Sequence, residues 1–298
     1  MTDLTASAAS RLETRKPYRS RWEYIGWAVA ILVVALLLLS TVTNPNFHWE
    51  VVGQYLAAPI ILEGVWMTLV LTAISIVLGV LIGAVLAVMM RSQSAVLARL
   101  ASAYVWFFRG TPLLVQLIFW FNLAALYPTI GFGAYTINAT HLITPFFAAV
   151  IGLTTNEAAY MAEIIRGGFE SVHRGQTEAA NSLGLRPRHV TFRILLPQAM
   201  KVIVPVIGNQ TIAMLKNSSL VSVLGVSELL HSAEIIYGTN YQTIPLLIVA
   251  SLWYLAMSTV LSVVQHAVES AYGRDSRSSS QVKPKTALKT ALQKAGEP

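Results

Sequence analysis

Apolar residues along the chain gather into long stretches that are nearly free of charge, and shorter polar segments separate these stretches. As a helix, residues 25–42 are roughly 27 Å long at 1.5 Å per residue, close to the ~30 Å hydrocarbon core of a bilayer. Comparable stretches follow at residues 64–90, 112–127, 143–165, 202–215 and 244–264. The pattern predicts an all-α membrane protein with about six transmembrane helices.

The predicted spans differ in regularity. Residues 64–90 carry no charge, and a helix of that length is ~40 Å long, so we expect it to tilt or to extend beyond the bilayer. Thr111 is placed to cap the next helix, with Pro112 as its first residue. Residues 202–215 are few and are interrupted by Pro205, which predicts a broken helix buried among the others. Between the spans the pattern predicts loops at 43–62 and 128–142 and a polar, partly re-entrant segment at 216–242.

The two ends of the chain are polar and basic. Residues 1–21 precede the first apolar stretch, an order that also occurs in cleaved signal peptides. The stretch is long for a signal peptide, however, and no small-x-small cleavage site follows it, so we predict a retained first helix. Residues 270–298 are rich in Ser and Lys, which predicts a disordered basic tail.

Composition and charge placement support a membrane location and set an orientation. The chain is 55% hydrophobic and 12% charged, against about 25% charged in soluble domains. With the N-terminus in the cytoplasm, every Lys and Arg except Lys216 falls in cytoplasmic segments. The positive-inside rule therefore places both termini in the cytoplasm. The same placement attributes the net charge of +7 to contact with membrane lipid, and no nucleic-acid-binding motif is present.

One polar segment, residues 176–197, lies between spans and must therefore stay at a membrane surface, because its charges would be costly in lipid. It is predicted to form two short helices around a turn. Glu178 would lie in the first turn of the first helix, and Gly184 would supply a left-handed cap. Pro187 would begin the second helix and Pro197 would end it.

Seven positions of this hairpin share fixed residues and spacing with a known pattern: Glu178, Ala179, Ala180, Gly184, Ile194, Leu196 and Pro197. The hairpin resembles the coupling segment in the membrane subunits of ATP-binding cassette (ABC) importers. Further stretches resemble permeases for polar amino acids within that family: residues 64–69, 107–116, 158–168, 175–176 and 215–220. The resemblance covers about residues 60–268, and leaves 1–21 as a cytoplasmic segment, 22–59 as an extra helix with an outer loop, and 269–298 as the tail.

The resemblance implies a multi-pass bacterial cell-membrane protein with several partners. A second permease subunit, identical or related, would complete the pore, and an extracellular or periplasmic binding protein would deliver the amino acid. Two ATPase subunits would hold the ATP and Mg²⁺, and this chain would bind no cofactor itself. Glu178 would pair with a basic group of the ATPase, while the small Ala179 and Ala180 would let the helix seat in an ATPase groove.

Polar residues within the spans are candidates for the substrate path. Glu157 stands past the middle of the fourth span, where a charged residue is a functional candidate by default. It could favour a basic amino acid, although a carboxyl group hydrogen-bonded between helices is an equally open interpretation. The other candidates for the path are Asn156, Asn209, Gln210 and Lys216. Glu163, in contrast, is predicted to form an ion pair with Arg166 near the inner surface.

Other functions find little support in the sequence. It contains no G-x-x-x-x-G-K-[ST] phosphate loop, no H-E-x-x-H and no G-x-S-x-G, which argues against ATP binding or hydrolytic catalysis by this chain. An importer subunit of the same fold for another solute, such as an opine or an osmolyte, remains open. A secondary carrier is less favoured, because a carrier has no use for an ATPase-docking hairpin.

Overall fold

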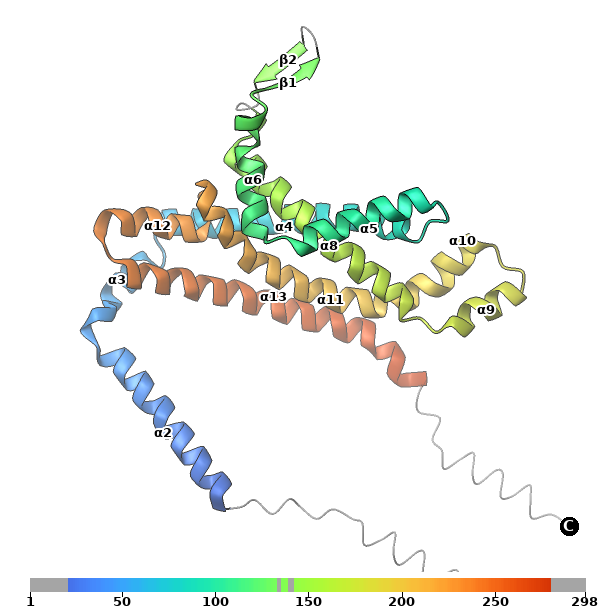
Figure 1. The fold of residues 1–298 in the computed structure, drawn as a ribbon. Helices are drawn as coiled ribbons and strands as arrows, with labels where there is room; N and C mark the ends of the chain where they lie inside the picture. Colours follow the sequence, from blue (N-terminus) through green and yellow to red (C-terminus); the bar gives the residue numbers. More distant parts are fainter. Residues whose placement is uncertain (1–20, 133–134, 139–141, 280–298) are drawn as a thin grey trace, which may run out of the picture. The chain divides into compact units, whose positions relative to one another are not determined.

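A computed structural model describes residues 21–132, 135–138 and 142–279 (Figure 1). The basic segment 1–20, part of the predicted loop 128–142 and the tail from residue 280 lie outside the described residues. The chain divides into two units, residues 1–50 and 51–298, which are described separately. In the first unit, helix α2 (Arg21–Thr43) confirms the predicted first apolar helix. Its side chains are exposed on all sides, as expected of a helix that meets lipid.

The described part of the second unit is almost entirely helical, which confirms the predicted fold class. Its helices are α4 (Pro59–Met90), α5 (Ala95–Gly110), α6 (Leu113–Leu126), α8 (Pro145–Glu170), α9 (Arg174–Ser182), α10 (Pro187–His189), α11 (Leu196–Asn217), α12 (Leu229–Asn240) and α13 (Thr243–Ser279). A π-helical segment, η2 (Val190–Leu195), joins α10 to α11, and a 3-10 segment, η3 (Ser218–Leu224), follows α11.

Three predicted connections are more ordered than the sequence indicated. The segment 43–62 contains the 3-10 turn η1 (Pro45–Phe47) and helix α3 (Trp49–Tyr55). The uncharged loop after α6 contains a two-stranded antiparallel hairpin, β1 (Thr129–Phe132) and β2 (Tyr135–Asn138). The segment 216–242 is mostly η3 and α12. Apolar and aromatic residues in these connections allow regular structure that a count of polar residues does not reveal.

Four described helical stretches are long and apolar enough to cross a membrane: Trp22–Thr43, Pro59–Met90, Pro187–Leu224 and Thr243–Ser270. The pair α5–α6, bent by 106°, makes a fifth if it counts as one span. The predicted count of about six is reached only with α8, whose polar residues keep it below the same threshold. Much of α8 is buried against other helices, which is where a bundle tolerates polar side chains.

The fifth predicted span is not a short, broken helix. Residues 187–224 form one continuous helical stretch that passes through η2, α11 and η3. Pro205 lies inside α11, and Gln265 of α13 donates a hydrogen bond to the Pro205 carbonyl at 3.3 Å. The helix thus continues through the proline, although Pro205 has no N–H to donate to the carbonyl of Lys201.

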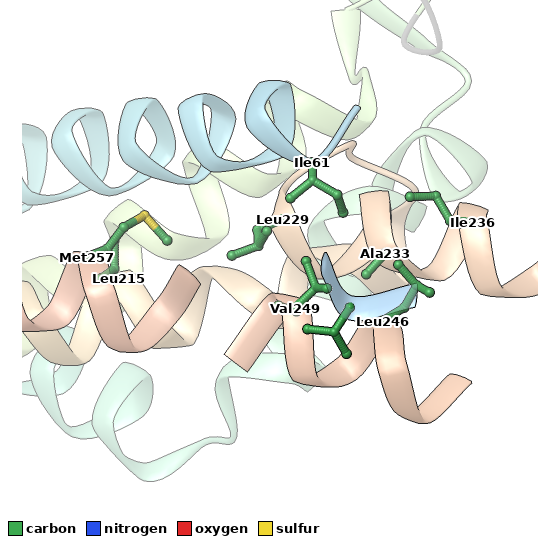
Figure 2. Packing of buried hydrophobic residues seen from close by; sticks show 10 residues of the cluster. Ile61, Leu215, Leu229, Ala233, Ile236, Leu246, Val249 and Met257 are labelled. Atoms are coloured by element: carbon green, nitrogen blue, oxygen red, sulfur yellow. The ribbon is translucent and has the colours of Figure 1, made fainter. Parts of the chain in front are cut away.

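Close packing of α4 on α8 organises the centre of the second unit. A Cβ placed on Gly79 would lie 2.7 Å from Cγ of Glu157, and one on Gly83 would lie 2.5 Å from Cβ of Met161. Small residues at such a contact let two membrane helices approach closely. A separate apolar cluster joins α4, α11, α12 and α13, with Ile61, Leu229 and Leu246 among its fully buried members (Figure 2).

Candidate functional site

The bend between α5 and α6 is the structural basis of the candidate site. Helix α5 ends at Gly110, Thr111 has an extended backbone, and Pro112 occupies the N-cap position of α6. The prediction that Thr111 caps α6 is therefore wrong: its hydroxyl instead donates to the carbonyl of Phe107 at 2.9 Å. The extended residues interrupt the helical hydrogen-bond ladder, so the carbonyl groups near the bend need other donors.

Two side-chain amides supply these donors. Gln116 Nε2 donates to the carbonyls of Phe108 (2.9 Å) and Thr111 (3.1 Å). Asn156 Nδ2 from α8 also donates to the Phe108 carbonyl at 3.0 Å and to Gln116 Oε1 at 3.2 Å. Asn156 therefore holds the bend to α8. In the sequence Gln116 was noted only as part of a motif, although an amide side chain in an apolar stretch indicates hydrogen bonding to another polar group within the bundle.

Glu157 follows Asn156 in α8, and 1% of its surface is exposed. Gln210 Nε2 of α11 donates to its Oε2 at 3.2 Å, so the structure brings these two predicted residues together. The other oxygen, Oε1, has no hydrogen-bond partner among the described residues. A buried carboxyl group with an unsatisfied oxygen is costly, which is typical of functional rather than purely structural groups.

An open groove of ≈ 520 Å³ adjoins the bend. Its polar lining comprises Arg109, Thr111, Asn156, Tyr160, Gln210 and Asn217. Glu157 does not line the groove itself, but it is hydrogen-bonded to Gln210, which does. Neither Asn209 nor Lys216 lines this groove: both are exposed elsewhere on the surface of the second unit. Of the five residues predicted for the path, the groove thus includes Asn156 and Gln210.

A second open groove, of ≈ 680 Å³, shares Arg109 and Gly110 with the first. Its lining includes Glu163, Arg166 and Glu170 of α8. Arg166 is 2.6 Å from Glu163 and 2.7 Å from Glu170, which confirms the predicted Glu163–Arg166 ion pair. The two grooves together give a polar surface that runs along α8 past the bend.

The hairpin of α9 and α10 connects α8 to α11 (Figure 1). Gly184 has a φ of +67°, as predicted for a left-handed cap, and Pro187 begins α10 as predicted. Glu178 is the fifth residue of α9, because the helix begins earlier, at Arg174, with His173 as its N-cap. Pro197 does not end the second helix: it lies in the first turn of α11, where its missing N–H is tolerated.

The hairpin has its own small apolar core. Ala180, 2% exposed, packs there with Val190 and Leu195 and with Phe169 at the end of α8. The Ala180 side chain is thus covered by the hairpin itself, and its predicted part in seating the helix in an ATPase groove stays a prediction. Glu178 and Ala179 are exposed, as are the apolar Leu183 (78%) and Phe192 (65%). These four residues are part of the exposed surface of the hairpin, which also includes residues 181–189.

A second buried carboxyl group, Glu228, was not singled out from the sequence. It is fully buried and caps α12, accepting hydrogen bonds from the N–H groups of Leu230 (3.0 Å) and His231 (2.7 Å). Tyr254 of α13 also donates to it at 2.7 Å. Glu is not one of the residues that usually cap a helix N-terminus, and no local pattern reports its burial, so this role has no clear signal in the sequence.

Comparisons with known proteins agree on one family. Residues 75–274 match the family model described as "Binding-protein-dependent transport system inner membrane component". The chain is 39% identical over 264 residues to the arginine transport system permease protein ArgU of Corynebacterium glutamicum, covering 88% of this chain and 83% of ArgU. It is 36% identical over 222 residues to the L-cystine transport system permease protein TcyB of Bacillus subtilis, covering 74% and 89%.

A solved structure gives the same result. The chain superposes on one chain of a crystal structure of an amino acid ABC transporter with histidines, with a TM-score of 0.65 and 37% sequence identity. The match covers 72% of this chain and 94% of the other. The architecture of the second unit is thus similar to that of a known transporter.

Proposed function

Because the chain belongs to the family of binding-protein-dependent transport system inner membrane components, we propose that its polar groove carries an amino acid through an ATP-driven importer. The chain is a multi-pass membrane permease subunit, and separate ATPase subunits hydrolyse ATP in such systems. The observation that carries the proposal is the connection between groove and hairpin. The hairpin joins α8 to α11, the two helices whose side chains Asn156 and Gln210 line the groove.

This connection supports a coupling mechanism. On one side, the hairpin core includes Phe169 of α8, so α9 is packed onto the end of that helix. On the other side, α10 continues into α11 without a break. A push on the hairpin would therefore shift both helices of the groove, and the Glu157–Gln210 hydrogen bond crosses between those helices. Packed helices that move as rigid bodies are a common means of alternating access.

The partners and orientation follow from the same proposal. The hairpin faces the cytoplasm, where the positive-inside rule places it. Glu178 meets a basic group on an ATPase subunit that holds ATP and Mg²⁺, and the exposed Leu183 and Phe192 add apolar contact. A binding protein delivers the substrate on the outer side. A second permease subunit, identical or related, completes the pore within the lipid bilayer.

We further propose a basic amino acid as the substrate. Glu157 supplies a buried carboxyl group next to the groove, and a side-chain rotation of Gln210 would open it to a cationic side chain. The similarity to ArgU agrees with this choice. The similarity to TcyB shows that relatives in this family differ in substrate, so another small solute stays the alternative.

The coupling role of the hairpin is tested by purifying the tagged chain from its host and identifying the proteins that come with it. We expect an ATPase, and we expect Glu178→Arg to reduce ATP-driven uptake in vesicles by about tenfold or more, since a charge pair becomes a repulsion. The matched control is Glu50→Arg, an exposed glutamate that the orientation places outside. Uptake that survives Glu178→Arg and copurification without any ATPase would both contradict the coupling role.

A further inference from the structure

Arg109 is the charged residue that the two grooves share. It lies at the end of α5, one residue before Gly110, at the point where the helix bends away. Both the groove at the bend and the groove along α8 include it in their lining. Whatever moves from one groove to the other must therefore pass the Arg109 guanidinium.

The guanidinium is held in place but weakly paired. It lies over the ring of Tyr160, 5.5 Å from the ring centroid, which orients it through a cation–π contact. Its ion pair with Glu163 is long, at 3.7 Å, whereas Arg166 reaches the same carboxylate at 2.6 Å. The Arg109 side chain is 43% exposed, so most of its five N–H donors are available to a ligand.

The groove at the bend has the charge to receive an anion. Arg109 is the charged residue in its described lining, and the other polar groups there are neutral amides and hydroxyls. Of the two glutamates of α8 near it, Glu163 lines the other groove, and Glu157 is buried and accepts a hydrogen bond from Gln210. A planar guanidinium matches the two oxygens of a carboxylate, and every α-amino acid carries one.

We propose that Arg109 binds the α-carboxylate of the substrate amino acid as it passes the bend. This inference rests on the proposed function and adds a division of labour to it. Arg109 recognises the group that all amino acids share, while the region around Glu157 and Gln210 recognises the side chain. One contact to the α-carboxylate and a separate contact to the side chain would let one fold serve amino acids of different kinds.

The test compares an amino acid with its methyl ester, which lacks the carboxylate charge. The full complex with its ATPase subunits, in lipid nanodiscs and without binding protein, is titrated calorimetrically with L-arginine and with L-arginine methyl ester. We expect the wild type to prefer the free acid by at least about tenfold, the factor that one hydrogen bond between charged groups supplies. In Arg109→Gln the ratio of the two affinities should fall to about one. If Arg109 had a purely structural role, the substitution would weaken the binding of both ligands equally.

Two further variants make the result specific. Arg109→Lys keeps the positive charge but lacks the planar pair of N–H donors that matches a carboxylate. It should therefore retain part of the preference for the free acid, even if Arg109→Gln assembles poorly. Arg99→Gln, at an exposed position of the same helix, should leave the preference unchanged. A preference that survives both Arg109 variants overturns the proposal. The proposal is also overturned if mass spectrometry shows that the Arg109 variants lose a bound anionic phospholipid while their preference for the free acid is unchanged. The groove would then hold a lipid phosphate.

Failure of the proposed function gives a different outcome. If vesicles containing the wild-type complex and its binding protein import none of the common amino acids, the importer assignment fails and the Arg109 proposal fails with it. If they import an amino acid other than arginine, that amino acid and its ester replace the arginine pair. Import with an unchanged ester preference in the Arg109 variants overturns the Arg109 proposal alone.

Discussion

Two buried carboxyl groups, Glu157 and Glu228, lie in the same unit but in opposite surroundings. Both are almost completely covered, at 1% and 0% exposure. Glu228 accepts hydrogen bonds from two backbone N–H groups and the Tyr254 hydroxyl. Glu157 accepts from Gln210, and its second oxygen has no partner in the described part of the chain.

The difference is the basis for proposing a structural role for Glu228 and a functional one for Glu157. Glu228 ties the start of α12 to α13, and its donors come from groups that would otherwise be unsatisfied. Glu157 accepts one hydrogen bond between α8 and α11, and its other oxygen stays buried without a partner in the described part of the chain. Burial alone therefore says little about a polar residue in a membrane bundle, and the number of donors around it says more.

The largest expected effect is on Glu228. Glu228→Ala leaves the Tyr254 hydroxyl and two N–H groups without an acceptor, which should lower the stability of the fold by about 3 kcal/mol or more. Thermal unfolding of the purified chain in detergent measures this. Tyr254→Phe removes one donor and should cost about 1 kcal/mol. Equal stability of Glu228→Ala and the wild type would show that Glu228 does not stabilise the fold.

Gly79→Ala tests how tightly Glu157 is enclosed. The added Cβ would lie 2.7 Å from Cγ of Glu157, so α4 and α8 must separate, at a cost of about 1–3 kcal/mol. Gly167→Ala on α8 is the matched control, because nothing lies within 4 Å of its Cβ position. That control should be neutral or slightly stabilising, by up to about 1 kcal/mol, as for other helical glycines. The same unfolding assay applies, and similar behaviour of the two variants would refute the close packing.

Glu157→Gln should have the smallest effect on stability and a selective effect on transport. The substitution keeps the shape and an acceptor for Gln210, so we expect a stability change within about 1 kcal/mol. Uptake of arginine and lysine in vesicles should fall by about tenfold relative to neutral amino acids, because a buried cation loses its counter-charge. Glu63→Gln, at an exposed position of α4, is the control. A uniform change in the uptake of all amino acids would indicate that Glu157, like Glu228, has a structural role.

Much of the fold could be predicted because membrane helices follow directly from apolar stretches. The hairpin was equally accessible, since Gly184 and Pro187 have backbone requirements that depend on few neighbours. The bend at Thr111 could not be predicted, because an apolar pattern indicates which residues avoid water and not the angle between successive helices. Pro205 was misleading for a related reason: a proline inside a helix is tolerated where neighbouring helices pack around it, and a local pattern does not report that packing.

The site was predicted in part. A charged or amide side chain inside a span is visible in the sequence, which is how Asn156, Glu157 and Gln210 were found. Which way each one points depends on helix phase, and that explains why Asn209 proved to be exposed next to Gln210. The buried position of Ala180 depends on the fold of the hairpin onto Phe169, which no local pattern announces.

The π-helical segment η2 sets the rotational register of everything that follows it. A π-helical turn holds about one more residue than an α-helical turn, which corresponds to a phase offset of about 100° for later side chains. Gln210 therefore faces Glu157 only because this offset lies between it and the hairpin. A change that converted 190–195 to a regular α-helix without removing a residue would turn α11 by about 100° relative to the hairpin, and so uncouple the surface proposed to bind an ATPase from the groove without altering either.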